Sequence, residues 1–295
     1  METDMPGKSI QDTISRISQP PTLPEVVMHL IRVVDDPATS ASEVSRIISR
    51  DQSLTTSVLK LVNSPFYGMS RQITTLTQAT VVLGFTTIRN IALTAAIFDE
   101  FGGGSTAAMP GGYSRAGFWE HSISCAIAAR CLAGYAAYAD TEQAFISGLI
   151  HDLGKVVLDE YLHEDFRRAL ELAEQEKMRI REAEQHIFGT DHAEVGGWLA
   201  RRWNLPDSLV AVIENHHNPT QSQVAPKLAA LVHLADIIVR MQGYGHAGDN
   251  SNPVIDRMLW VQINISEEAM PSILDDIAEK YHEARDFIEM VRGDV

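Results

Sequence analysis

Apolar residues recur at intervals of three and four along almost the whole chain, which is the spacing of one face of an α-helix. Val26, Val27, Leu30, Ile31 and Val34 are one example, whereas the alternation of a half-buried strand is hard to find over strand lengths. Side chains repeat every 3.6 residues in a helix and every two in a strand, so the pattern favours helices throughout. We therefore expect an all-α protein.

Length and charge limit what this chain can be. Its 295 residues correspond to roughly two packing units at about 150 residues per domain. Apolar residues make up 45% and charged residues 21%, a composition that excludes disorder for most of the chain. The net charge of −15 opposes broad, sequence-independent binding to DNA or RNA. Residues 1–90 carry as many basic as acidic residues, so the excess negative charge lies in residues 91–295.

A segment rich in glycine separates the neutral part from the acidic part. Residues 102–112 contain five glycines, one proline and no charge, which is typical of a linker or loop. The last helical stretch is expected at about residues 267–292. We predict four regions: an N-terminal helical subdomain (1–100), a Gly-rich linker or loop (101–113), a metal-binding helical core (114–242), and a loop with C-terminal helices that pack on the core (243–295).

The cysteines and the N-terminus predict a cytoplasmic protein. Cys125 and Cys131 stand six residues apart in an apolar stretch, which suits a reduced chain better than a disulfide framework, and both are expected to be buried. The first residues lack the basic and apolar regions of a signal peptide. Arg130 interrupts the most apolar stretch, so we expect no membrane span.

One histidine and one aspartate stand together at the end of an apolar helix. His151 and Asp152 follow residues 144–150, whose one polar member is Ser147. Burying such groups without partners costs about 2–7 kcal/mol each, so other groups must satisfy them. Because adjacent helical residues diverge by about 100°, the pair can bind one metal or bridge two. Lys155 lies one turn further on, beside His151.

Four further helices each offer an inward imidazole or carboxylate. His121 lies on a stripe of small core residues, and Asp236 interrupts an apolar face. His192 begins one helix, and the pair His216-His217 ends another before a proline. The complete set of candidate ligands is His121, His151, Asp152, His192, His216, His217 and Asp236.

The chemistry of this set predicts a metal centre inside a helical bundle. The donors are imidazole and carboxylate without thiolate, which favours iron, manganese or zinc over a structural thiolate zinc site. Seven ligands exceed the needs of one ion. We therefore expect two divalent ions about 3.5–4 Å apart, an arrangement that activates water and holds phosphate oxygens for in-line attack. Lys155 would then contact the phosphate.

The segment Gly148-Leu-Ile-His151-Asp152-Leu-Gly-Lys155 resembles the HD superfamily of metal-dependent phosphohydrolases. Residues 61–68, 118–122, 191–196 and 203–206 resemble the HDOD domain, the HD-related output domain, and the resemblance covers about residues 20–240. It implies an all-helical bacterial signalling module, in which an N-terminal bundle packs on an HD-type bundle. Such modules are commonly linked with receiver or cyclic di-GMP machinery and usually lack demonstrated catalysis.

The sister family HD-GYP hydrolyses cyclic di-GMP at a two- or three-iron site whose ligands follow the same order, which makes iron the favoured metal here. This chain departs from that family in two places. Gly117 stands where the family has a glutamate one turn before the first histidine, and Asn218-Pro219-Thr220 follows the histidine pair instead of Gly-Tyr-Pro. The first difference argues against a third metal, and the second removes the loop that shapes the cyclic dinucleotide pocket.

Two functions of different classes fit the sequence. The first is a regulatory protein with a dinuclear metal site that binds a signalling protein or a small nucleotide ligand. The second is a metal-dependent phosphohydrolase for a nucleotide such as a cyclic dinucleotide, with Asp152 and Lys155 as its catalytic residues. In that enzyme the metals lower the pKa of a bridging water toward about 7. A third alternative is a metal-free site whose polar groups bond to one another, and the oligomeric state is not indicated.

Overall fold

The computed structural model describes residues 10–17, 19–34, 36, 38–103, 107–251, 255–285 and 288. Within these residues every regular element is a helix and no strand occurs, which confirms the predicted all-α fold. The α-helices are α1 (Ile10–Ser15), α2 (Glu25–Val33), α3 (Ala41–Ile48), α4 (Gln52–Val62), α5 (Leu76–Leu83), α6 (Phe85–Phe101), α7 (Arg115–Tyr135), α8 (Thr141–Ile150), α9 (Leu153–Tyr161), α10 (His163–Glu176), α11 (Ile180–Phe188), α12 (His192–Arg202), α13 (Asp207–Asn215), α14 (Pro226–Gln242), α15 (Arg257–Ile263) and α16 (Met270–Glu283), and the 3₁₀ helices are η1 (Pro65–Tyr67), η2 (Pro110–Gly112), η3 (Pro219–Gln221) and η4 (Glu267–Ala269).

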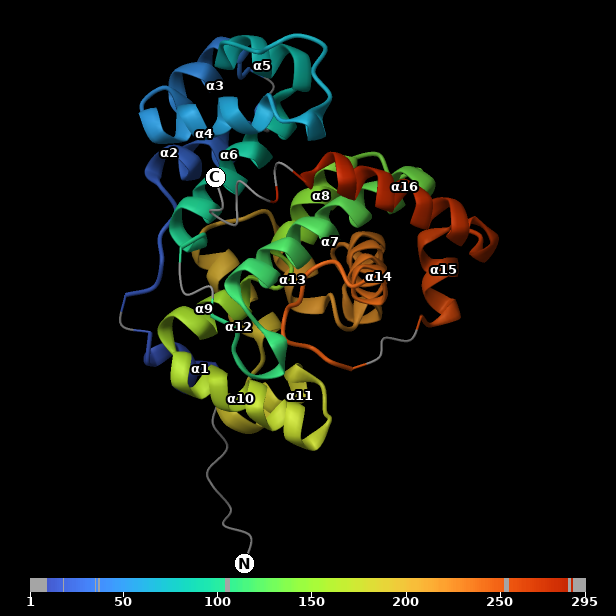
Figure 1. The fold of residues 1–295 in the computed structure, drawn as a ribbon. Helices are drawn as coiled ribbons and strands as arrows, with labels where there is room; N and C mark the ends of the chain where they lie inside the picture. The colour runs from blue at the N-terminus through green and yellow to red at the C-terminus, as the bar shows by residue number, and fades with distance from the viewer. Residues whose placement is uncertain are drawn as a thin grey trace, which may run out of the picture.

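The helices form two bundles. Helices α2–α6 make an upper bundle that stands on a lower bundle of α7–α14, with α15 and α16 at its side (Figure 1). No helix in the described part of the chain is both long enough and apolar enough to span a bilayer.

Side-chain caps fix where the helices that carry the site begin. The Ser114 hydroxyl accepts a hydrogen bond from the Gly117 backbone N–H at 3.0 Å at the start of α7. The Asp191 carboxylate accepts one from the Glu194 N–H at 3.1 Å, which starts α12 at His192. Each cap contributes about 1 kcal/mol. The caps therefore set the register in which α7 and α12 present their side chains to the interior.

The two bundles share buried surface through α6, η1 and α8. The rings of Phe66 and Phe145 lie 5.2 Å apart between centroids, and the Asn90 side chain donates to the Glu142 carbonyl at 3.2 Å. One apolar core runs through both bundles. The domain boundaries around residues 101–113 stay a prediction, and residues 104–106 of that segment lie outside the described residues.

The first helix contacts the lower bundle rather than the upper one. The Thr13 hydroxyl donates to the Phe188 carbonyl at 3.1 Å, and the Trp203 indole N–H donates to the Pro21 carbonyl at 2.9 Å. Helix α1 accordingly lies beside α10–α12 (Figure 1). The upper bundle therefore begins at α2, although the predicted N-terminal subdomain includes α1.

The C-terminal region contains one helix that the periodicity did not indicate. Helix α15 has seven residues, and the exposed apolar residues Met258 and Val261 stand between its buried residues Leu259, Trp260 and Ile263, which obscures the stripe. The stretch expected at 267–292 starts with η4 and continues as α16, which ends at Glu283. Helix α16 packs along α7, where the Tyr281 hydroxyl donates to Glu120 at 2.5 Å.

Two glycines allow close helix crossings in the lower bundle. A Cβ atom at Gly148 would lie 2.6 Å from the Cys125 carbonyl oxygen, where α8 crosses α7. A Cβ atom at Gly154 would lie 1.9 Å from the His192 carbonyl oxygen, where α9 crosses α12. Both distances are too short for any side chain, so only glycine permits these crossings. They bring the junction between α8 and α9 against both α7 and α12.

We expect Gly148→Ala to lower the free energy of unfolding by about 1–3 kcal/mol, because the added methyl group would overlap the α7 backbone. Gly134→Ala is the matched control, since it also adds a methyl group within a helix but meets no atom within 4 Å. It should leave the stability unchanged or raise it by up to about 1 kcal/mol. Urea denaturation followed by circular dichroism measures both. Equal stabilities of the two variants would contradict the crossing.

Candidate metal centre

The junction between α8 and α9 places His151 and Asp152 in the interior. The two residues are 0% and 2% exposed. The Nδ1 atom of His151 lies 2.7 Å from the carbonyl oxygen of Gly148. Because a carbonyl oxygen can only accept, Nδ1 carries a proton and donates it there. In the neutral ring, Nε2 therefore keeps its lone pair and points into the interior.

This lone pair of His151 faces another acceptor. Burial lowers the pKa of His151 to about 4, despite the opposing Asp152 carboxylate, so the ring is neutral near pH 7. The Oδ2 atom of Asp152 lies 3.4 Å from Nε2, and Nε2 has no hydrogen-bond partner among the described residues. Two buried acceptors that face each other are unfavourable without a cation to satisfy both.

His216 repeats this pattern at the end of α13. Its Nδ1 donates to the Ile213 carbonyl at 2.8 Å, and its Nε2 is another buried atom for which the described part of the chain offers no hydrogen-bond partner. The Oδ1 atom of Asp152 lies 3.4 Å from this Nε2 and 3.2 Å from the Nε2 of His192. Asp152 therefore faces His151 with one carboxylate oxygen and the other two histidines with the second.

All seven predicted residues come together, in two groups whose ligand atoms lie within 4.8 Å of one another. They come from α7, the α8–α9 junction, α12, the end of α13 and α14. The donor atoms are those that bind divalent metals, so the cluster can hold such an ion. Subsite A consists of His121, Cys125, His151 and Asp236, and subsite B of Asp152, His192, His216 and His217.

Glu184, which is not among the residues predicted from the sequence, orients His192 of subsite B. This fully buried carboxylate on α11 accepts hydrogen bonds from His192 Nδ1 at 2.5 Å and from the His192 backbone N–H at 3.0 Å. Burial lowers the pKa of His192, but the Glu184 and Asp152 carboxylates together outweigh burial and raise the pKa to about 9. A signal was available, since Glu184 lies between Ile180 and Phe188 on the buried face of α11. The same criterion identified Asp236.

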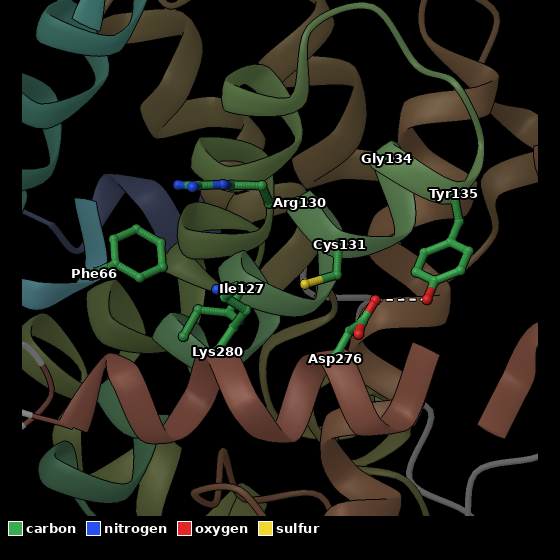
Figure 2. Close-up of a pocket in the computed structure, with 8 residues that line it drawn as sticks. All are labelled: Phe66, Ile127, Arg130, Cys131, Gly134, Tyr135, Asp276 and Lys280. Atoms are coloured by element: carbon green, nitrogen blue, oxygen red, sulfur yellow. Dashed lines mark hydrogen bonds between the residues drawn. The ribbon is translucent and has the colours of Figure 1, made fainter. Parts of the chain in front are cut away.

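The two cysteines differ in burial and in surroundings. Cys125 is fully buried as expected, and its Sγ atom lies 3.4 Å from His121 Nε2, so a sulfur stands within a donor set expected to contain none. Its position four residues after His121 was the available signal. Cys131 is only partly buried, contrary to the expectation. It lines a separate cavity of about 490 Å³ with Phe66 and Lys280 (Figure 2).

A cavity of about 220 Å³ adjoins the ligand groups, and its lining includes two cationic side chains, Lys155 and Arg240, beside three aspartates. The Lys155 ammonium donates to Asp152 Oδ2 at 2.7 Å. Burial alone would lower the pKa of Lys155. The charge and the hydrogen bond of Asp152 oppose burial, and the pKa lies above its ordinary value, so the ammonium group is charged. The Arg240 guanidinium lies 3.7 Å from Asp236 Oδ2. Ammonium and guanidinium groups such as these two bind anions such as phosphate.

The 243–251 loop covers this cavity. The His246 backbone N–H donates to the Gly117 carbonyl at 2.9 Å, and Arg240 donates to the Ser251 carbonyl at 2.6 Å. A Cβ atom at Gly117 would lie 3.3 Å from the His246 carbonyl oxygen, so the loop occupies the space beside this glycine. The sequence predicted a polar loop here but not its contact with the site.

The model of the HDOD domain family matches residues 21–219, about two thirds of the chain. This chain belongs to the HDOD family. The match contains six of the seven predicted ligands and ends before Asp236 and the 243–251 loop. The matched residues thus include all of subsite B and all of subsite A except Asp236.

Other proteins resemble this HDOD chain over most of its length. An HDOD domain protein of unknown function from Geobacter sulfurreducens has a solved structure with a TM-score of 0.73 at 26% identity, over 96% of this chain and 94% of that one. A candidate signal transduction protein from Marinobacter aquaeolei VT8 shares the fold, with a TM-score of 0.77 at 19% identity, over 96% of this chain and 61% of that one.

A curated relative is longer than this HDOD chain. An uncharacterized protein of Treponema pallidum (strain Nichols) is 28% identical over 244 residues. The match covers 81% of this chain but 45% of the relative, so the HDOD chain corresponds to less than half of that protein.

We expect Glu184→Gln to weaken metal binding at subsite B by about 10–100-fold, because the amide holds the His192 ring less firmly than the carboxylate does. Glu176→Gln, at an exposed carboxylate on neighbouring α10, is the control and should bind as the wild type does. Competition against a chromophoric chelator measures the affinities, after circular dichroism has verified the fold. An unchanged affinity in Glu184→Gln would rule out this positioning role.

Proposed function

We propose that this chain is a regulatory HDOD protein that holds two divalent metal ions in its lower bundle and acts by binding a signalling protein or a small ligand. The observation that carries the proposal is the pair of buried ligand groups on either side of the Asp152 carboxylate. Iron is the metal we favour from the family resemblance, and zinc or manganese also fits imidazole and carboxylate donors.

The charges of the cluster fit a cation. Burial alone would raise the pKa of Asp152, but Lys155 above all lowers it well below its ordinary range. Burial likewise opposes ionisation of Asp236, whose pKa the hydrogen bond with His121 lowers. Both carboxylates are thus ionised, and they lie next to the neutral His151, whose Nε2 has no hydrogen-bond partner among the described residues. Bound metal would neutralise them and cross-link the helices that carry the ligands.

The size of the cavity favours binding of a small ligand over turnover of a nucleotide. Its volume of about 220 Å³ lies below the roughly 300–1,000 Å³ of sites for drug-sized molecules. A cyclic dinucleotide would therefore require the 243–251 loop to move away from Gly117 and Arg240. A phosphate-sized anion needs no such movement.

Helix α8 provides a physical route from the metal centre to the upper bundle. Its last turn leads into His151, and its first half carries Glu142 and Phe145, which contact Asn90 and Phe66. Ten helical residues span about 15 Å, and a helix of this length moves as a rigid element. A change of occupancy at His151 would therefore alter how the upper bundle packs, and with it the surface offered to a partner.

We expect removal of metal by a chelator to lower the thermal stability. A ligand at 100 times its Kd stabilises the folded state by about 2.7 kcal/mol, which disappears on removal. Asp152→Asn removes a ligand of subsite B and should respond less to the chelator than the wild type does, whereas Asp275→Asn, at an exposed site on α16, should respond as the wild type does. Elemental analysis and thermal denaturation provide the readouts. Absence of metal together with no chelator effect would favour the metal-free alternative.

A second function, phosphohydrolysis, is favoured by one observation, the cations Lys155 and Arg240 in the cavity beside the carboxylates. The regulatory proposal predicts no turnover of cyclic dinucleotides or generic phosphodiesters by the metal-loaded protein with added iron or manganese. Hydrolysis that is lost in a folded Asp152→Ala variant would support the enzyme instead. Product formation can be followed by chromatography.

A further inference from the structure

Helix α7 presents a nitrogen and a sulfur atom to the same point of the interior. Cys125 follows His121 by one turn, and residues four apart share one helix face. The Sγ atom lies 3.4 Å from His121 Nε2 and within 4.8 Å of the ligand atoms of His151 and Asp236. Cys125 is 0% exposed, so the sulfur lies away from bulk solvent.

Two of the distances between these atoms are close to the edges of a tetrahedral metal shell. Metal–nitrogen and metal–oxygen bonds of about 2.0–2.1 Å and a metal–sulfur bond of about 2.3 Å place two nitrogen or oxygen ligands roughly 3.4 Å apart, and nitrogen and sulfur roughly 3.6 Å apart. The observed distance from His121 Nε2 is 3.4 Å to Cys125 Sγ and 3.2 Å to Asp236 Oδ1. Small adjustments would therefore let these side chains coordinate one ion.

His151 supplies an independent observation at the same point. Its Nε2 belongs to subsite A, is fully buried and has no hydrogen-bond partner in the described ranges, while its Nδ1 donates to Gly148. This is the arrangement of a histidine that binds metal through one nitrogen and is oriented through the other. The unpartnered Nε2 of His151 favours a cation at this point, and Cys125 Sγ lies in the same group of ligand atoms.

We infer that Cys125 is a thiolate ligand of the metal ion in subsite A, together with His121, His151 and Asp236. The inference rests on the proposed function, because it requires a metal in the centre. When the sulfur–metal bond forms, the S–H bond breaks and its proton leaves to solvent, so the charge balances. A thiolate makes subsite A more suitable for zinc or iron than for manganese.

A fourth protein ligand changes what subsite A can do. Structural zinc sites have four protein ligands, whereas catalytic zinc sites have three and keep one position for water or substrate. With Cys125 bound, subsite A has a complete shell. Two-metal hydrolases need both ions to hold the reacting oxygens, so a closed subsite A fits a regulatory centre better than a hydrolase.

Titration of the metal-free full-length chain with cobalt(II), under reducing and anaerobic conditions, tests the inference. Visible absorption bands report cobalt binding, and a near-ultraviolet sulfur-to-cobalt charge-transfer band reports thiolate coordination. We expect about two cobalt ions per wild-type chain, with the charge-transfer band from one of them. Cys125→Ser should keep the visible bands of subsite B and lose the charge-transfer band.

Cys131→Ser is the matched control, because it removes the other cysteine of the chain from a cavity on another face of α7 (Figure 2). It should keep both kinds of band. Cobalt binding without a charge-transfer band in the wild type would overturn the Cys125 inference and leave the proposed function standing. Loss of the band in Cys131→Ser instead of Cys125→Ser would also overturn it. Failure to bind cobalt at all would overturn both.

X-ray absorption at the zinc edge of the zinc-loaded wild-type protein gives an answer that needs no variant to fold. A sulfur neighbour at about 2.3 Å supports the inference. A shell that contains only nitrogen and oxygen contradicts it, whatever the behaviour of Cys125→Ser.

Discussion

The arrangement of the lower bundle depends on one buried carboxylate. Asp152 directs one oxygen to His151 and Lys155, which are close to it in the sequence, and the other to His192 and His216, which are distant, so four side chains converge on it. A buried charge is tolerated only where such partners surround it. The glycines at the helix crossings, the caps and the buried Glu184 all serve to hold these partners in place.

Much of this centre could be predicted from the sequence because a polar residue on an apolar helix face has few physical explanations. That criterion found His121 and Asp236, and it would have found Glu184 had it been applied to α11. Cys125 was not predicted as a ligand because a buried cysteine also packs well in an apolar core. A single sequence does not distinguish core packing from metal ligation. The periodicity predicted the all-α fold, which the structure confirms.

Other features had no local signal. The 243–251 loop reads as a polar connection, and its place over the cavity follows from its hydrogen bond to Gly117, which is far away in the sequence. Helix α1 precedes the upper bundle in the chain yet packs on the lower one, because its contacts with Phe188 and its neighbours depend on tertiary structure. Periodicity indicates which face of a helix is buried, but not against which partner.

The HDOD match ends at residue 219, whereas Asp236, Arg240 and the 243–251 loop all contribute to the centre or its cover. The stretch that the family model matches is thus shorter than the stretch that supplies the candidate ligands and the cover of the cavity. Relatives that agree with this chain up to residue 219 and diverge afterwards would keep the same helical scaffold but differ in the side of the cavity that Asp236, Arg240 and the 243–251 loop form here. Sequence differences among such proteins can then concentrate after residue 219. There they would change which ion is bound and how ligands reach it, without disturbing the helices before that residue.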